Sequence, residues 1–88
     1  MKMLYFTAPG CGVCHALKPK VQDMVQRDFP KIHFREVKID EESQTSGQYL
    51  VFTVPAIIVL ENNKEVLRMA GPFGIDQFRG KMKKLNEI

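Results

Sequence analysis

The stretch "KMLYFTAPGCGVCHALKPK", residues 2–20, holds the change of pattern that decides the fold. Residues 2–7 form a short apolar run, which predicts a buried strand that ends at the Ala-Pro-Gly of residues 8–10. From Cys11 onward the apolar residues instead recur on one helical face, at positions 17, 21, 24, 25 and 29. Pro30 follows this stripe, where helices usually end. The pair Cys11 and Cys14 is therefore predicted to lie where a strand passes into a helix.

Three further strands and two further helices are expected. β-branched residues predict a second strand over residues 32–40, with Val37 and Ile39 on one face. The polar residues 41–48 are typical of a loop, and we expect a short helix around Ser46–Phe52. Pro19, inside the first helix, is expected to kink its axis because proline lacks the backbone donor.

A hairpin and a terminal helix complete the pattern. The hairpin strands are expected at Ala56–Leu60 and Glu65–Met69, joined by "ENNK", because asparagine tolerates a positive φ. Apolar residues at helical spacing predict a last helix over residues 75–87. The order β-α-β-α-β-β-α predicts an α/β fold with a right-handed parallel crossover and an antiparallel hairpin in one four-stranded mixed sheet. Helices are expected on both faces, which makes three α/β/α layers.

Length and composition narrow the class of protein. The 88 residues predict one domain, residues 1–88, and 44% hydrophobic with 26% charged residues is typical of a soluble globular protein. No apolar run reaches the roughly 18 residues that span a bilayer, and the N-terminal run is too short for a signal peptide. We therefore expect a cytoplasmic monomer without membrane partners. The net charge is +3, and much of the excess positive charge lies near the end of the chain. Because no aromatic residues are interleaved with these basic residues, we expect no nucleic-acid partner.

The sequence C-G-V-C-H, residues 11–15, allows three chemistries. It could form a redox disulfide, hold zinc, or attach haem covalently. Haem would take His15 as an axial ligand, but such attachment usually accompanies export. Zinc would need both histidines, and His33 falls outside the expected spacing after the cysteines. We therefore expect no metal and no prosthetic group, and we expect the cysteines to be redox-active because a reducing cytosol disfavours structural disulfides.

The predicted position of the pair assigns a role to each cysteine. The first turn of a helix has unpaired backbone N–H groups and a partial positive charge, and both stabilise a thiolate. Lowering a thiol pKa from about 8.5 to about 7 needs about 2 kcal/mol, near the upper limit for a helix terminus. Cys11, at the N-terminal end of the predicted helix, is predicted to attack the substrate disulfide. Cys14 lies one turn further on the same face, about 5–6 Å away between Cα atoms, and is predicted to resolve.

The chain resembles the thioredoxin–glutaredoxin superfamily in a minimal form, over essentially its whole length. The resemblance rests on "CGVC" after the first strand, Pro19 five residues after Cys14, "KID" at the end of the second strand, and "TVPAIIVL" at 53–60. It implies that Pro55 follows a cis peptide bond and that the backbone of Val54 lies beside the cysteines. There it would pair with an extended substrate segment as a short β-ladder. Tyr49 and Gly71 also occupy thioredoxin-like positions.

Three positions depart from the thioredoxin pattern. Gly10 stands where thioredoxins usually have tryptophan, and Gly12-Val13 replaces Gly-Pro between the cysteines. Tyr5 stands where the family has a buried aspartate that is thought to manage the proton of the resolving cysteine. Glu36 is a possible substitute, although a surface strand carboxylate is the commoner case.

The resemblance implies a small thioredoxin-like enzyme that reduces protein disulfides. Its substrate site would comprise Val54 and Pro55, bordered by Gly10, Gly12, Val13 and Gly71. Its electron donor would be a thioredoxin reductase-like enzyme or glutathione. Two alternatives remain open. A glutaredoxin-like, glutathione-dependent enzyme fits "TVP" at 53–55, but "GPFGID" at 71–76 has only Asp76 where that branch has Gly-Gly and acidic residues. A thioredoxin-fold binding module with incidental cysteines is the other.

Overall fold

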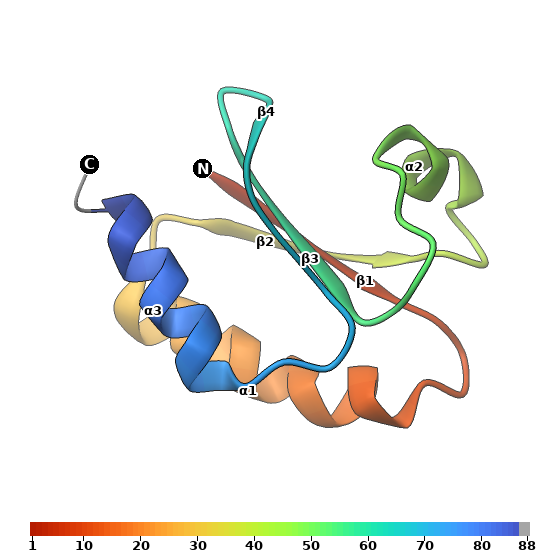
Figure 1. Ribbon diagram of the computed structural model, residues 1–88, viewed down its shortest axis with the longest axis horizontal. Helices are drawn as coiled ribbons and strands as arrows, with labels where there is room; N and C mark the ends of the chain where they lie inside the picture. The colour runs from red at the N-terminus through yellow and green to blue at the C-terminus, as the bar shows by residue number, and fades with distance from the viewer. Residues whose placement is uncertain (87–88) are drawn as a thin grey trace.

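The chain alternates strands and helices in the order β-α-β-α-β-β-α (Figure 1). The computed structural model describes residues 1–86. The elements are β1 (Lys2–Thr7), α1 (Gly12–Asp28), β2 (His33–Lys38), α2 (Ser43–Gln48), β3 (Ala56–Glu61), β4 (Lys64–Ala70) and α3 (Ile75–Asn86). This order confirms the one expected from the sequence.

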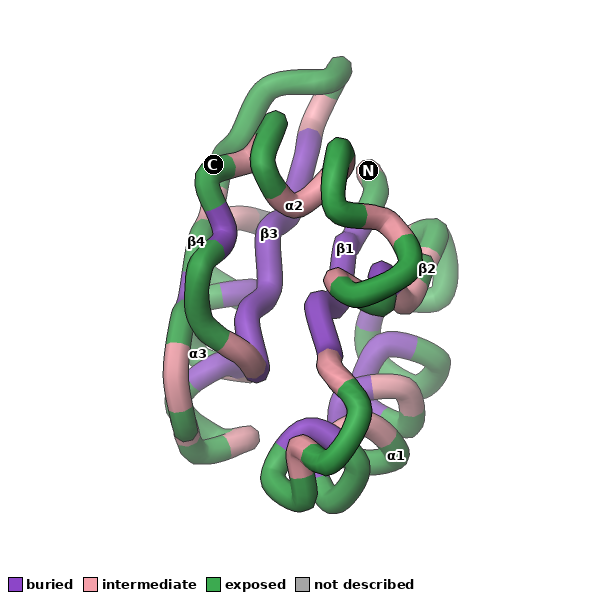
Figure 2. The backbone as a smooth tube through the Cα atoms, turned by 90° about the vertical axis from the view of Figure 1, so that its right-hand side faces the viewer, coloured by how far each residue is buried: buried purple, intermediate pink, exposed green. Residues whose placement is uncertain are grey.

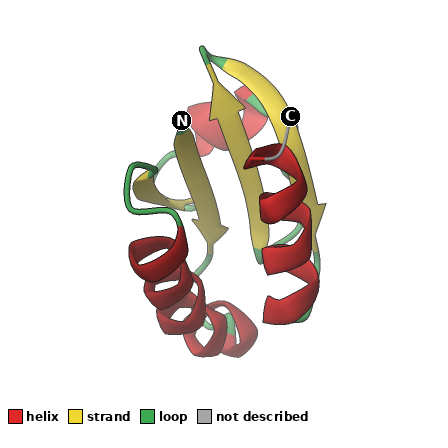
Figure 3. Ribbon diagram, turned by 90° about the vertical axis from the view of Figure 1, so that its left-hand side faces the viewer, coloured by secondary structure: helices red, strands yellow, loops and turns green. Residues whose placement is uncertain are grey.

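The four strands form one mixed sheet in the order β2-β1-β3-β4. β1 and β2 are parallel, whereas β1–β3 and β3–β4 are antiparallel. α1 and α3 lie on the same face of the sheet (Figure 3). An ion pair of 3.3 Å between Arg79 and Asp28 joins the two helices. α2 lies on the opposite face (Figure 1). The predicted α/β class, with a four-stranded sheet between helices, is therefore confirmed.

Two apolar clusters fill the spaces on either side of the sheet. β1 is central, so residues of both alternating sets are buried along it. Met3 and Tyr5 face α1 and α3, and they pack with the stripe of α1 that the sequence predicted. Leu4 and Phe6 face the other side, where they pack with Val37 and residues of β3. Each such fully buried large side chain contributes about 1.5–3 kcal/mol by leaving water.

The strand register places the end of β1, the start of β3 and the end of β4 at one edge of the sheet. Phe6, near the end of β1, pairs with Ala56 at the start of β3. Ala56 in turn pairs with Ala70, at the end of β4. The loop from β1 to α1, the segment before β3 and the loop after β4 therefore meet at the same edge.

The short helix α2 is the main correction to the sequence prediction. It spans Ser43–Gln48, so the expected helix around Ser46–Phe52 was wrong at both ends. The helix ends early because Leu50 takes a left-handed conformation, with φ of 56°. The amide of Leu50 donates to the carbonyl of Gly47, and the amide of Val51 donates to that of Ser46. These two bonds form a Schellman motif, which closes a helix.

The other boundaries differ from prediction by one or two residues. β2 covers His33–Lys38 rather than 32–40, because the amides of Glu41 and Glu42 turn back to the carbonyl of Lys38. The hairpin strands are each extended, to Ala56–Glu61 and Lys64–Ala70. Asn62 and Asn63 both have positive φ, 53° and 66°, which confirms the asparagine turn. Residue 87, the predicted end of the last helix, lies outside the described residues.

Candidate active site

Cys11 and Cys14 form a disulfide at the start of α1. Their Cα atoms lie 5.3 Å apart, within the predicted distance. Cys11 caps the helix and is partly exposed, whereas Cys14 lies one turn inside and is fully buried. Only Cys11 is therefore open to a sulfur atom from another molecule.

A backbone amide points at the sulfur of Cys11. The N–H of Cys14 donates to Cys11 Sγ, with 3.2 Å between the nitrogen and the sulfur. This amide is one of the first-turn donors that no helical carbonyl can pair. The Sγ atom, here in a disulfide, marks where the thiolate of the reduced form would lie. The amide and the helix dipole are thus placed to stabilise negative charge on Cys11.

The residues around the cysteines are small or exposed. Gly10 has φ of 76°, a conformation that favours glycine and lets the chain turn from β1 into α1. Gly12 is exposed at the first position of α1, and the side chain of Val13 is 49% exposed. The turn between the two cysteines therefore has an open surface.

The segment before β3 lies at the same edge of the sheet (Figure 1). The Val54–Pro55 peptide bond is cis, as the family resemblance implied. Pro55 is buried and Val54 partly buried. The amide of Gly71 donates to the carbonyl of Pro55 at 2.8 Å, and Gly71 has φ of 78°. The fold thus brings Val54, Pro55 and Gly71 together at the edge where β1 leads into Cys11.

Tyr5 makes a contact that sequence reasoning missed. Its fully buried hydroxyl donates to the carbonyl of Cys14, with 2.7 Å between the oxygens. Burial, with the negative charge of Glu36 as a second cause, raises the pKa of Tyr5 to about 12. The hydroxyl therefore stays protonated and ties β1 to the turn that carries Cys14. One signal pointed to this residue, since the family resemblance places Tyr5 at the position of a buried aspartate.

Glu36 belongs to a polar network between β2 and α1. It pairs with Tyr5 in the parallel register, so its carboxylate lies on the α1 side of the sheet. Lys18 Nζ donates to it at 2.7 Å, and Thr7 Oγ1 donates at 2.9 Å. The hydrogen bond from Lys18, opposed by partial burial and assisted by Thr7, lowers the pKa of Glu36. Glu36 is therefore an anchored carboxylate rather than a free one on a strand surface, and its part in proton transfer stays a prediction.

The two histidines lie apart. His15 is exposed on α1 beside Cys14, next to a small pocket that Thr7 and Glu36 also line. His33 begins β2 and pairs with Lys2, at the opposite end of β1 from the cysteines. The two histidines and two cysteines thus do not converge on one point. Within residues 1–86, no group of three or more His, Cys, Asp or Glu side chains is arranged to hold a metal ion.

The thioredoxin family model matches residues 1–84. The chain belongs to the thioredoxin family. A curated relative, the thioredoxin-like protein YdfQ of Bacillus subtilis, is 33% identical over 85 residues, which cover 97% of this chain and 75% of that protein. Thioredoxin from the same organism is 30% identical over 66 residues, or 75% of this chain and 64% of its own length.

Solved structures agree with this assignment. Thioredoxin 1 from Thermosipho africanus superposes with a TM-score of 0.90 at 32% identity, covering 99% of this chain and 96% of the other. Fasciola hepatica thioredoxin gives a TM-score of 0.84 at 25% identity, over 94% and 78% of the two chains. Together with the Cys11–Cys14 disulfide, this makes the chain a thiol–disulfide oxidoreductase of the thioredoxin family.

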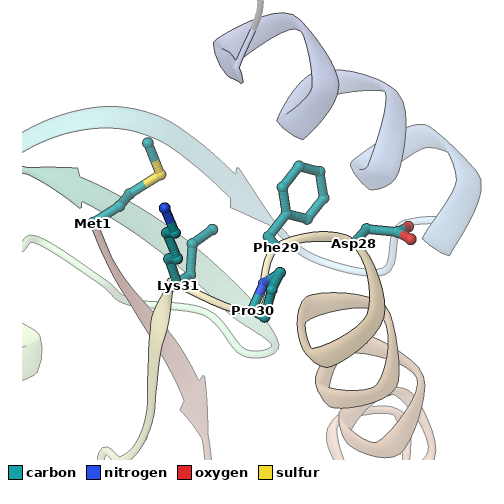
Figure 4. Close-up of a pocket in the computed structure, with 6 residues that line it drawn as sticks. Met1, Asp28, Phe29, Pro30 and Lys31 are labelled. Atoms are coloured by element: carbon teal, nitrogen blue, oxygen red, sulfur yellow. The ribbon is translucent and has the colours of Figure 1, made fainter.

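A second pocket lies away from the redox site of this thioredoxin-family protein. Figure 4 shows it between Met1, which precedes β1, and the turn after α1. Phe29 and Pro30 form its apolar part, with Lys31 beside them. None of the predicted redox residues lines it.

None of the helices within residues 1–86 has the length and apolar character that crossing a membrane requires.

Proposed function

We propose that this chain reduces disulfide bonds in other proteins, with Cys11 as the attacking cysteine and Cys14 as the resolving one. The observation that carries the proposal is the asymmetry of the pair. Cys11 is partly exposed, and its sulfur accepts a hydrogen bond from the backbone amide of Cys14. Cys14 is fully buried. A group that must meet a large substrate needs exposure, and a group that acts only afterwards does not.

The proposed reaction has two exchange steps. In the reduced protein the Cys11 thiolate attacks one sulfur of the substrate disulfide, and the other substrate sulfur leaves as a thiolate. The Cys14 thiol then loses its proton and attacks Cys11 Sγ, which releases the second substrate sulfur. The substrate gains two electrons and takes up two protons as it becomes a dithiol. The protein is left with the Cys11–Cys14 disulfide.

The substrate would lie along Val54 and Pro55, with Gly10, Gly12, Val13 and Gly71 around it. Support comes from the register, which puts the segment before β3 and the loop after β4 at the edge where α1 begins. The open surface of Gly12 and Val13 leaves room for a polypeptide to approach Cys11.

The partners, location and assembly are part of the same proposal. Oxidised protein needs an electron donor, for which we propose a thioredoxin reductase-like enzyme, with glutathione as the competing donor. We propose that the chain acts as a monomer in the cytoplasm and serves in redox homeostasis. A reducing compartment would keep the cysteines in the dithiol form that the reaction requires.

Reduction of insulin with dithiothreitol tests the activity. Wild type should accelerate precipitation of the insulin B chain, whereas Cys11→Ser should equal the uncatalysed rate. Val66→Ser, at an exposed site on β4, is the matched control and should keep the wild-type rate. An inert wild type would favour the binding-module alternative. Replacing dithiothreitol by NADPH with thioredoxin reductase, or by glutathione with its reductase, then distinguishes the two donors.

A further inference from the structure

The segment Leu50–Val54, between α2 and β3, presents two large apolar side chains to water. Phe52 is 79% exposed and Leu50 is 67% exposed, while Val51 between them is buried. Figure 2 shows this mostly exposed stretch running into the buried β3. Single exposed apolar residues are common, but here two of them lie within one short segment that leads to Val54 and Pro55.

The segment is held in place rather than loose. Arg68 on β4 donates to the carbonyl of Tyr49 at 2.5 Å and to that of Leu50 at 3.4 Å. Glu65 accepts two hydrogen bonds from the same guanidinium, which fixes its orientation. Leu50 also keeps the left-handed conformation that glycine would adopt more easily. A large side chain kept in such a conformation and facing water points to a use for that side chain.

The backbone of this segment is free to pair. Within residues 1–86, the amide and carbonyl groups of Phe52, Thr53 and Val54 take part in no hydrogen bond. The chain bends at residues 53–55, so these groups form no continuous strand, but each of them can still form a hydrogen bond with another chain. Affinity in such pairing comes from main-chain bonds, and selectivity comes from the side chains that alternate along it.

We propose that Leu50–Val54 is a specificity surface that binds an extended segment of the substrate protein and selects an apolar side chain near its reactive cysteine. The proposal rests on the proposed function, because the segment leads directly into Val54 and Pro55. Phe52 lies two residues before Val54, and side chains of an extended substrate alternate with a period of two, so a substrate cysteine near Val54 brings the side chain two residues away toward Phe52. A small pocket between Leu50, Phe52, Thr53 and Arg68 receives that side chain.

Synthetic peptides with the sequence X-Ala-Cys-Ala-X, blocked at both ends, test the proposal. Their cysteine carries free cysteine as a disulfide, and X is leucine or serine at both positions. Both directions of binding are covered because X lies two residues from the reactive cysteine on either side. Wild type should favour the leucine peptide over the serine peptide about tenfold in kcat/KM, as apolar contacts in such sites do.

Two variants then locate the preference. Phe52→Ser and Leu50→Gly should each bring the ratio of the two kcat/KM values close to one. Leu50→Gly suits the left-handed backbone, so its urea midpoint should equal or exceed that of wild type, and unfolding would not explain the lost ratio. Val66→Ser, which removes an exposed apolar side chain away from this segment, should keep the ratio.

The outcomes separate this inference from the proposed function. Equal rates of wild type with both peptides would overturn the inference and leave disulfide reduction standing. A tenfold ratio that survives in both variants would also overturn it. A wild-type dimer that Phe52→Ser converts to monomers would assign the segment to self-association instead. No reduction of either peptide, or of insulin, would remove the proposed function and the inference together.

Discussion

Replacing Glu36 by glutamine should destabilise the oxidised protein in a pH-dependent way. The carboxylate accepts hydrogen bonds from Lys18 and Thr7, and its side chain is only 18% exposed. A hydrogen bond to a charged group contributes about 1.5–3 kcal/mol. Glutamine keeps the shape and one acceptor oxygen, and Lys18 is 33% exposed. We therefore expect a loss at or below the low end of that range, about 1–1.5 kcal/mol at pH 7.

The sign of the pH dependence follows from the lowered pKa of Glu36. Because the folded pKa lies below the ordinary value of 4.5, the ionised carboxylate stabilises the folded state above that pH. This contribution is lost as the pH falls below about 4.5 and through the folded pKa. The variant carries no charge at any pH, so the difference between the two proteins should be full at pH 7 and shrink toward pH 3.5.

Urea unfolding at several pH values between 7 and 3.5 measures this difference. In a thermal melt of a chain of this size, the same loss of 1–1.5 kcal/mol would lower Tm by roughly 4–12 °C. Glu41→Gln is the matched control, since its carboxylate is 65% exposed and lies 4.0 Å from Lys38. It should cost less than about 0.5 kcal/mol. Equal stability of wild type and Glu36→Gln at pH 7, or a loss that does not change with pH, would refute the reasoning.

The same variant addresses proton transfer. Within residues 1–86, Glu36 makes no hydrogen bond to either cysteine, so the pH–rate profile for insulin reduction should match that of wild type. A shifted profile would instead give Glu36 a part in moving the proton of Cys14.

Three further substitutions test the packing around the site. Tyr5→Phe removes the buried hydrogen bond to the Cys14 carbonyl and should cost about 1 kcal/mol by urea unfolding; an unchanged midpoint would contradict the role given to the hydroxyl. Gly71→Ala puts a Cβ on a backbone with φ of 78° and should cost about 1–2 kcal/mol, a loss that thermal melting would detect and that equal Tm values would disprove. Phe78→Ala empties a fully buried site of α3 beside Phe73 and should cost about 3–5 kcal/mol; calorimetry showing a loss below 1 kcal/mol would contradict this packing.

The features that local pattern determines were predictable. The helical stripe that ends at Phe29 and the turn at Asn62 and Asn63 each depend on residues close in sequence. The distance between Cys11 and Cys14 follows from helix geometry alone. The bounds of α2 were predicted wrongly because none of its residues is buried, so its sequence carries no apolar periodicity that would indicate a helix.

The contacts between distant elements were not predictable in the same way. Tyr5 reaches Cys14 because α1 packs on the face of β1 that carries Tyr5. Glu36 reaches Lys18 because β2 pairs in parallel with β1 and turns Glu36 to the same face. A shift of one residue in that register would turn Glu36 to the other face of the sheet. The exposed pair Leu50 and Phe52 was likewise hidden, since it depends on where α2 ends and on Arg68 from β4.

Trapping of the intermediate tests the assignment of the two cysteines most directly. Each single variant, Cys11→Ser and Cys14→Ser, is mixed with a protein that carries one disulfide, and the products are measured by intact mass under non-reducing conditions. Cys14→Ser should accumulate a covalent complex joined through Cys11, because the second exchange step is blocked. Cys11→Ser should give none, since Cys14 is fully buried. A complex that accumulates with Cys11→Ser and not with Cys14→Ser would contradict the account.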